Sequence, residues 1–408
     1  MEPPTCPHQL DPTGSELHAE AARLRDRGPA TRVLLPGEVE AWLVTDPVVL
    51  RSLFADPRVS KDPHRHWPGY RDLPADWPLH TWVSMRNMFN SQGADHRRLR
   101  ALIAPAFTGR RIRDLRPRIE EITAGLLDEV ASARPGVAVD LRERFANPLP
   151  VAVISSLLGI TGREAREEMR RLVELFFSTT TTPEQMVAGM ETLYRLFGEH
   201  VTSRRRDPGD DLTSDLLAMR DEDGTRLSDG ELTDTLMLMF SAGHETTVNL
   251  IGHAITALLT EPRHLASLRA GELSWEAVVE EALRWQPPLA NLPLRFAVED
   301  IAVPGGDTIR AGEPIVAGLL AANRHPEHHA DGDRFDPARA DTAHLSFGHG
   351  VHFCVGSQLA RLEARIALAA LFDRFPRLTA AFGELRQRPS FISNGHVELL
   401  AIPTPDGR

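Results

Sequence analysis

The sequence predicts a mainly α protein with a minor β part, an α+β fold, and three observations lead to this prediction. From about Ala94 to Leu259 the apolar spacing and residue preferences are mostly helical. Within that region, 228–259 is a long apolar-periodic helix with Ser228 or Asp229 as its cap. Residues 294–320 change character and carry short β-like runs separated by Gly and Pro. We expect one domain over 1–408, of which 1–14 form a flexible tail.

The first sixty residues are expected to combine a short helix with two strands. A helix capped by Ser15 runs to Arg25. The segments Arg32–Leu35 and Ala41–Val44 are expected to be strands on either side of a Pro-Gly turn. Asp46-Pro47 starts the next helix, because Pro is favoured at the first helical position. Residues 62–80, rich in Pro, Trp and His, are expected to be irregular.

Helix breaks and strand signals divide the rest of the chain. The helical breaks are expected near Gly109, Arg134-Pro135-Gly136, Thr161-Gly162, Thr180–Pro183 and Asp207-Pro208-Gly209. A further helix, Ser274–Trp285, ends at Pro287-Pro288. The β-like runs are Leu294–Val298, Ile301–Val303 and Ile315–Leu320. A second irregular stretch covers 322–346, and a last helix runs from about Ser357 to Phe375.

Composition excludes several classes of protein. The net charge of −11 disfavours nucleic acid as a partner, since binding phosphates needs a basic surface. Two cysteines, Cys6 and Cys354, cannot form a disulfide framework. Neither a secretory signal nor an apolar run long enough to span a bilayer is visible, so we expect a cytoplasmic protein without a membrane partner. Almost all positive charge is arginine, because Lys61 is the single lysine.

The most informative run is the glycine-rich segment Phe347–Gly356, which reads Phe-Gly-His-Gly-Val-His-Phe-Cys-Val-Gly. Its glycines leave room for backbone to approach a flat ligand. The helix that begins after Cys354 favours negative charge at its N-terminus and therefore the thiolate form. A lone thiolate suits an axial ligand to haem iron. The alternative is a buried structural cysteine.

The order Phe-x-x-Gly-x-His-x-Cys-x-Gly resembles the haem-binding signature of the cytochrome P-450 superfamily, the haem-thiolate monooxygenases. The resemblance implies the fold of that family, a triangular-prism arrangement with haem between the long central helix and the helix after the cysteine loop. It implies haem b, iron protoporphyrin IX, as cofactor and Cys354 as the axial ligand of its iron. Phe347, Gly350, His352 and Gly356 match the cofactor-binding positions of the same signature.

The long helix carries Ala242-Gly243-His244-Glu245-Thr246-Thr247, which is similar to the oxygen-activation segment of the family. Thr246 and Glu245 are the expected catalytic pair, because a hydroxyl and a carboxylate can pass protons into an apolar pocket. Ala242 and Gly243 are expected to face the cofactor, and Gly243 lets dioxygen approach the helix backbone. The alternative is a threonine bonded back to the preceding turn beside a solvated Glu245.

Two further sets of residues match positions of the family. The haem propionates need cationic or hydrogen-bonding partners, and the resemblance assigns His96, Arg100, Arg295 and His352 to them. The Glu-x-x-Arg pair Glu281 and Arg284, with Arg334 as third member, is expected to hold the cysteine loop. The exposed face of a helix is the ordinary alternative for a His-x-x-x-Arg spacing. Histidine pairs elsewhere lack the spacing of a zinc site.

The family's substrate-lining segments correspond to mostly apolar positions with a few polar ones. These residues are Met85, Met88, Phe89, Met237, Leu289, Asn291, Leu292 and Asn394. The set suits a hydrophobic small molecule with scattered oxygens, such as a steroid or a macrolide-like polyketide, and methionine offers adaptable contact. Hydroxylation, or epoxidation, is the expected reaction, and oxidative coupling of aromatic rings in a peptide or natural product is the alternative. A peroxide-driven enzyme and a non-catalytic haem sensor remain as further classes.

The resemblance also implies external electron donors. The sequence contains no flavin or iron–sulfur domain, so a ferredoxin and its NAD(P)H-dependent reductase are the expected partners, together with O2 and the substrate. Ferredoxins are usually acidic, and docking therefore needs a local basic patch. Its candidate members are Arg97, Arg98, Arg110 and Arg111.

Overall fold

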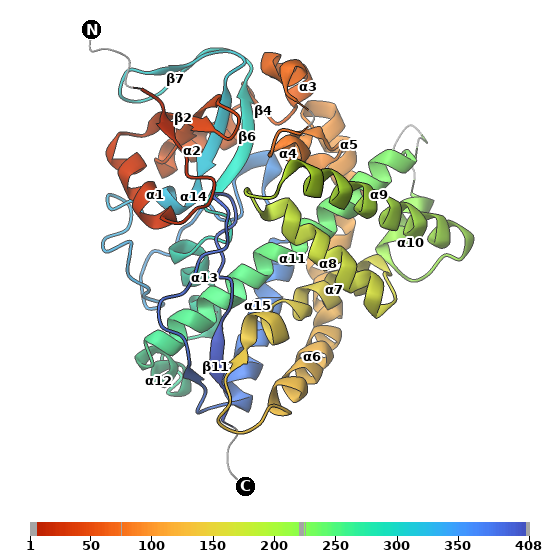
Figure 1. Ribbon diagram of the computed structural model, residues 1–408, viewed down its shortest axis with the longest axis vertical. Helices are drawn as coiled ribbons and strands as arrows, with labels where there is room; N and C mark the ends of the chain where they lie inside the picture. Colours follow the sequence, from red (N-terminus) through yellow and green to blue (C-terminus); the bar gives the residue numbers. More distant parts are fainter. Residues whose placement is uncertain (1–5, 75, 220–223, 225, 405–408) are drawn as a thin grey trace.

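The computed structural model describes residues 6–74, 76–219, 224 and 226–404, and in it helices surround a mixed sheet at one end of the molecule (Figure 1). The helices are α1 Leu17–Asp26, α2 Pro47–Ala55, α3 Pro63–His66, α4 His80–Ser84, α5 Gly93–Ile103, α6 Gly109–Ala131, α7 Pro148–Leu158, α8 Arg163–Phe177, α9 Pro183–Arg206, α10 Leu212–Ala218, α11 Asp229–Thr260, α12 Arg263–Arg269, α13 Trp275–Trp285, α14 Leu319–Asn323 and α15 Ser357–Arg374. Short 3-10 or π-helical turns occupy Pro68–Asp72, Met88–Asn90, Ala104–Phe107, Arg142–Ala146 and Gly350–His352. The expected fold class, mainly α with a minor β part, is confirmed.

The strands form three sheets. They are β1 His8–Gln9, β2 Ala30–Leu35, β3 Val39–Val44, β4 Val59–Ser60, β5 Val139–Asp140, β6 Asn291–Ala297, β7 Ile301–Ala302, β8 Thr308–Ile309, β9 Pro314–Gly318, β10 Thr379–Ala380 and β11 Leu400–Ile402. The largest sheet has the order β1-β2-β3-β9-β6-β4. In it β3 pairs parallel with β9, and β9 pairs antiparallel with β6. This pairing brings the first sixty residues next to residues 291–318.

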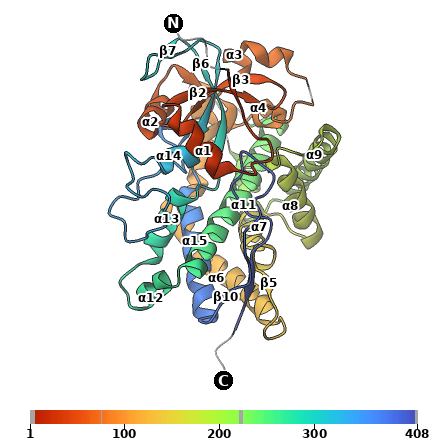
Figure 2. The ribbon, with the colours of Figure 1, turned by 60° about the vertical axis from the view of Figure 1, so that its left-hand side comes forward.

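The helix α11 forms the centre of the helical part. It spans 32 residues, and a capping box of Ser228 and Glu231 fixes its start by satisfying two otherwise free backbone N–H groups. It packs against α7, α9, α13 and α15, and Figure 2 shows it running through the middle of the molecule. Apolar residues surround most of its circumference, which is why its pattern lacks a clear polar face. The expected helix over 228–259 and its cap are confirmed.

Capping residues and turn residues predicted the positions of most helices and strands. Asp46 caps α2 by accepting hydrogen bonds from the amides of Val48 and Val49. Ser15 does not cap α1, which begins at Leu17, because its hydroxyl donates to Asp11 at 2.7 Å. The expected strand Ile315–Leu320 ends at Gly318, where α14 starts.

The N-terminal segment differs from the flexible tail expected over 1–14. His8 and Gln9 pair with β2, and Leu10 is 1 % exposed. Thr179 also donates a hydrogen bond to the carbonyl of Pro12. That expectation is therefore wrong for residues 8–12, because strand pairing and apolar burial hold them, and residues 1–5 lie outside the described part.

Buried apolar side chains gather in three clusters. One joins α4, α8, α9 and the first half of α11, a second joins α6, α7, α13, α15 and the second half of α11, and a third lies around the large sheet. Among the described helices, none alone has the length and apolarity to cross a membrane. The bent pair Arg142–Leu158 and Arg163–Phe177 meets those two criteria when its members are taken together.

Candidate functional site

Cys354 lies in a tight loop between the 3-10 turn Gly350–His352 and α15. Its amide donates to the carbonyl of Phe347 at 2.9 Å, which closes the loop. Gly350 has φ of +72°, and a Cβ there would lie 2.5 Å from the carbonyl oxygen of Phe54 in α2. No residue with a side chain fits at this point without moving α2. The sequence therefore builds a loop with a fixed shape that presents the sulfur.

Two opposing effects act on the thiol of Cys354. Burial among protein atoms raises its pKa. The backbone N–H of Gly356, the guanidinium groups of Arg100 and Arg361, and the N–H of Ser357 act in the opposite direction. The net shift is upward. The expected influence of the helix N-terminus is present, but it does not by itself produce a thiolate.

The four residues expected to bind the propionates lie together beside this loop. The rings of His96 and His352 are 4.1 Å apart, and the guanidinium of Arg295 lies 4.1 Å from the ring centroid of Phe54. Arg100 donates to the carbonyl of Phe353 at 2.8 Å. Nε2 of His96 and one terminal nitrogen of Arg295 are buried without a hydrogen-bond partner. Buried polar groups are normally paired, so these atoms point to a ligand that carries acceptors.

Positive charge dominates this cluster. Burial, together with the nearby groups of His96, Lys61, Arg295 and Arg100, lowers the pKa of His352 to about 2. Burial also lowers the pKa of Arg295 to about 10. The imidazole of His352 is therefore neutral and can donate one hydrogen bond while its other nitrogen accepts.

One face of α11 is accessible although the helix is otherwise buried. Leu238, Ala242 and Thr246 lie four residues apart on this face, and each is partly or fully exposed. The hydroxyl of Thr246 donates to the carbonyl of Ala242 at 2.6 Å. Gly243 is also partly exposed, and a Cβ there would only touch Ile154 at 3.5 Å. Packing alone does not require glycine at position 243.

Glu245 points into protein rather than to that accessible face. Its carboxylate pairs with Arg142 at 3.2 Å and Arg388 at 3.6 Å, and Ser393 donates to it at 3.2 Å. Burial raises its pKa, but the two guanidinium groups more than offset this, so the net pKa is lowered and the group is a carboxylate. The alternative interpretation is therefore wrong for Glu245, which is not solvated, and is confirmed for Thr246, whose hydroxyl bonds back to the preceding turn. These three partners were missed because they lie far away in the sequence.

The buried ion pair Glu281–Arg284 is present, but its third member differs from the expected one. Arg284 Nε lies 2.7 Å from Glu281 Oε2, and both side chains are 0 % exposed. Arg339, not Arg334, approaches Glu281 Oε1, at 3.5 Å. The side chain of Arg334 is 51 % exposed and pairs with Asp336. Only its backbone carbonyl joins the network, by accepting from Arg284 at 3.0 Å.

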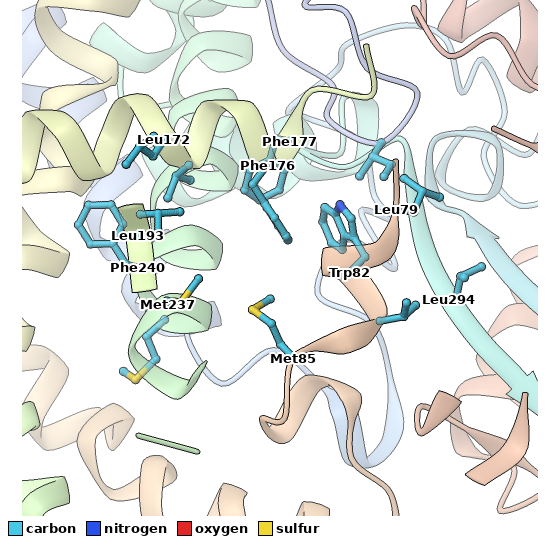
Figure 3. Packing of buried hydrophobic residues seen from close by; sticks show 14 of the residues in the cluster. Leu79, Trp82, Met85, Leu172, Phe176, Phe177, Leu193, Met237, Phe240 and Leu294 are labelled. Carbon is cyan, nitrogen blue, oxygen red and sulfur yellow. The ribbon is translucent and has the colours of Figure 1, made fainter. Parts of the chain in front are cut away.

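The apolar residues expected to contact substrate converge near α11. Met85 and Met237 line a small cavity with Phe176, and Figure 3 shows these three side chains coming from separate segments. Trp82 stacks on Phe176 with centroids 4.6 Å apart. Partly buried residues at the edges of the apolar clusters are Met88, Phe89, Leu289 and Leu292. These residues offer aromatic surface from Trp82 and Phe176 and thioether surface from Met85 and Met237.

The side-chain amides of the two asparagines assigned to the pocket donate hydrogen bonds to other parts of the protein. Asn291 Nδ2 donates to the carbonyl of Phe391 at 2.7 Å. Asn394 is 0 % exposed, and its Nδ2 donates to Gln286 at 2.8 Å and to the carbonyl of Pro287 at 3.0 Å. The Nδ2 of Asn394 thus holds the chain that follows α13, while its Oδ1 is buried without a hydrogen-bond partner. Its assignment to the substrate pocket stays a prediction.

A larger cavity, of about 510 Å³, opens between α4 and α9. Its lining includes Trp77, His80, Thr81, Met186 and Tyr194. None of these was expected from the sequence, since no motif marks them. The cavity is mostly apolar, as a passage for a hydrophobic molecule requires.

Two of the four arginines proposed for docking form ion pairs with carboxylates. Arg98 forms an ion pair with Glu231, and Arg111 pairs with Asp215 at 3.0 Å. Arg97 and Arg110 are exposed. An arginine already paired with a carboxylate presents less net positive charge to a partner.

Known proteins are similar to this chain in sequence and in fold. The family described as "Cytochrome P450" matches residues 178–271 and 275–391. The 2-hydroxy-5-methyl-1-naphthoate 7-hydroxylase of Streptomyces carzinostaticus is 42% identical over 399 residues, 97% of each chain. The 6-deoxyerythronolide B hydroxylase of Saccharopolyspora erythraea is 40% identical over 365 residues, 88% of each chain. The structure of CYP154A1 from Streptomyces coelicolor A3(2) superposes with a TM-score of 0.93 at 48% identity and covers 97% of this chain and 100% of its own. Members of the family carry a haem iron, take electrons from redox partners and are oxidoreductases. This chain belongs to the cytochrome P450 family and is a monooxygenase.

Proposed function

We propose that the protein hydroxylates a hydrophobic natural product of the polyketide or steroid type, with haem b as cofactor and Cys354 as axial ligand of its iron. The observation that carries this proposal is the unpartnered buried nitrogens of His96 and Arg295 next to the cysteine loop. Both nitrogens can donate hydrogen bonds, as the two carboxylates of a bound haem would require.

The residues present fit such a group. His96, Arg100, Arg295 and His352 would hold the propionates, and a ligating thiol is deprotonated by the metal despite its raised pKa. Phe347, Gly350 and Gly356 would shape the loop that contacts the cofactor, and Ala242 and Gly243 would contribute the accessible face of α11. When bound, haem iron activates dioxygen and supplies the oxygen atom that is transferred to substrate.

The substrate is proposed from the lining and from the relatives. Met85, Met88, Phe89, Met237, Leu289 and Leu292 form an apolar wall that would exclude water and orient an extended hydrophobic molecule. The two relatives named above act, by name, on a naphthoate and on 6-deoxyerythronolide B. Both relatives are hydroxylases by name, which favours hydroxylation of a natural product here.

Proton delivery is assigned to Thr246, with Glu245 behind it. Thr246 is the hydroxyl on the accessible face of α11, so it would hold and donate the proton there. The carboxylate of Glu245 is held by Arg142 and Arg388. It would contribute when Arg388, whose side chain is 21 % exposed, turns outward and lets solvent protons reach it.

Electrons would come from a ferredoxin and its NAD(P)H-dependent reductase, which dock near Arg97 and Arg110. Arg98 and Arg111 would contribute less, since each faces a carboxylate. We also propose that residues 1–408 form one domain. The protein would be cytoplasmic and would have neither membrane nor nucleic-acid partners.

Turnover with defined partners tests this function. The ferric protein is screened with polyketides, steroids and aromatic peptides for the spectral shift caused by displacement of the axial water. With ferredoxin, reductase and NADH, a hit is expected to gain one oxygen atom, and the reduced CO complex is expected to show the thiolate-type band. Loss of two hydrogens without oxygen gain would identify ring coupling. Turnover with peroxide but not with NADH would contradict the proposal.

Thr246→Ala is expected to uncouple electron use from product formation. Without the hydroxyl, proton delivery slows by about 10²-fold or more, and reduced oxygen leaves as peroxide. We expect product per NADH to fall at least about tenfold while NADH oxidation continues. The measurement is peroxide and product formed per NADH consumed. Thr256→Ala is the matched control, because its hydroxyl makes the same bond one turn back, to Gly252 at 2.9 Å, further along α11. Full coupling in Thr246→Ala would remove this residue from the proton path.

A further inference from the structure

The single lysine of the chain is buried beside the proposed propionate site. Lys61 follows β4 and is 2 % exposed. Its ammonium donates to the carbonyl of Pro293 at 3.4 Å and lies 3.5 Å from the ring centroid of Phe89. A long hydrogen bond and an aromatic face satisfy an ammonium incompletely, since it has three donors.

Strand register places a second cation next to it. β4 pairs antiparallel with β6, with Val59 opposite Ala297 and Ser60 opposite Phe296. Lys61 is the next residue after β4, so one further step of this register would set it opposite Arg295, whose charge acts on it. Like charges at directly opposed positions destabilise a sheet. The sheet would not bring two buried cations together without a compensating group.

That compensation does not come from the protein itself. Among the described residues, no carboxylate pairs with Lys61 or Arg295 or acts on the pKa of either, and one terminal nitrogen of Arg295 has no hydrogen-bond partner. Burial lowers the pKa of Lys61 well below its usual value, and Arg295 lowers it further. An anion bound between the two groups would offset the lowering of the Lys61 pKa by burial and by Arg295.

We propose that Lys61 and Arg295 form a carboxylate-binding site, covered by the ring of Phe89, that takes either a haem propionate or a carboxylate of the substrate. This inference rests on the proposed haem site, because Arg295 belongs to both. Phe89 belongs to the proposed substrate wall, so the site lies at the border between cofactor and substrate. An ammonium and a guanidinium converging on one oxyanion are the charge-assisted donors that such a group requires.

The substrate source is tested with an acid and its ester. Spectral titrations of the holoprotein use tetradecanoate and methyl tetradecanoate, which differ in charge at one end. Lys61→Met is expected to reduce the preference for the acid over the ester about tenfold or more, because a hydrogen bond to a charged group contributes about 1.5–3 kcal/mol. Arg58→Met is the matched control, since it removes an exposed cation just before the same strand.

The propionate source is tested by haem retention. Transfer of haem from the holoprotein to excess apomyoglobin is expected to be at least about tenfold faster for Lys61→Met than for wild type and Arg58→Met. An effect on haem transfer without an effect on the acid–ester preference assigns the site to the cofactor. The opposite result assigns it to the substrate. No change in either measurement overturns the proposal.

A measurement on the wild-type holoprotein avoids any folding defect of the variant. Because the chain has one lysine, labelling with ζ-¹⁵N-lysine gives a single side-chain ammonium signal. If the site takes a propionate, this ammonium is expected to be protected from solvent exchange at pH 7 before any ligand is added. If it takes a substrate carboxylate, protection is expected with tetradecanoate and not with the ester. An unprotected signal in all three samples contradicts the site. The thiolate-type CO spectrum of the same wild-type sample reports the proposed function separately.

Discussion

Cys354→Ala is expected to lose the thiolate-type CO band and to lower hydroxylation by at least about 10³-fold, or about 4 kcal/mol in transition-state stabilisation. The reason is electronic, because a thiolate ligand favours cleavage of the O–O bond and alanine offers no ligand at all. The loop itself should persist, since its closing bond joins the backbones of Cys354 and Phe347. Difference spectra of the reduced protein and product formation with NADH measure the two losses.

Cys6→Ala is the matched control for that variant. Cys6 is the other cysteine of the chain and is exposed. It should keep the band, the haem content and the turnover of wild type. A thiolate-type band that survives in Cys354→Ala would assign the iron ligand elsewhere.

Glu281→Ala is expected to destabilise the protein by about 3–5 kcal/mol, because it leaves Arg284 buried without its carboxylate. Arg284 is 0 % exposed and also bonds the carbonyls of Gly332 and Asn323. Without its carboxylate, Arg284 would hold less firmly the segment that leads to the cysteine loop, whose carbonyls it bonds. Urea unfolding of the holoprotein, followed by far-UV circular dichroism, measures the change.

Arg339 and Arg334 provide a matched comparison within this network. Arg339→Met is expected to cost about 1.5–3 kcal/mol, the value of one hydrogen bond to a charged group. Arg334→Met removes only a surface pair with Asp336, for which about 0–1 kcal/mol is expected. Equal losses in the two variants, or a larger loss for Arg334→Met, would contradict the assignment of the third position to Arg339.

Much of the fold could be predicted because its signals are local. Asp46 and Ser228 cap helices by bonding amides two or three residues ahead, so the sequence alone shows both ends of the interaction. The cysteine loop is equally local, since Gly350 and Cys354 lie four residues apart. Ser15 shows the limit of this reasoning, because Asp11 competes for its hydroxyl.

The site required contacts that no spacing reveals. Glu245 meets Arg142 across 103 positions and Ser393 across 148, so a residue expected to be catalytic is tied into a buried ion network. Asn394, predicted to contact substrate from its place in the family pattern, donates its Nδ2 to Gln286 and to the carbonyl of Pro287 just after α13, contacts that no spacing in the sequence indicates.

The sequence by itself determined the fold class, the long central helix, the cysteine loop and the kinds of residue that surround it. Only the tertiary structure decided which arginine completes the network of Glu281, where the charge of Glu245 is neutralised, and that Lys61 lies beside Arg295. The physical reason is the distance along the chain over which each kind of interaction acts. Caps, turns and periodicity act within one or two turns of chain. The pairing of buried charges depends on strand register and on packing between segments that lie 58 residues apart for Glu281 and Arg339 and 103 residues apart for Glu245 and Arg142.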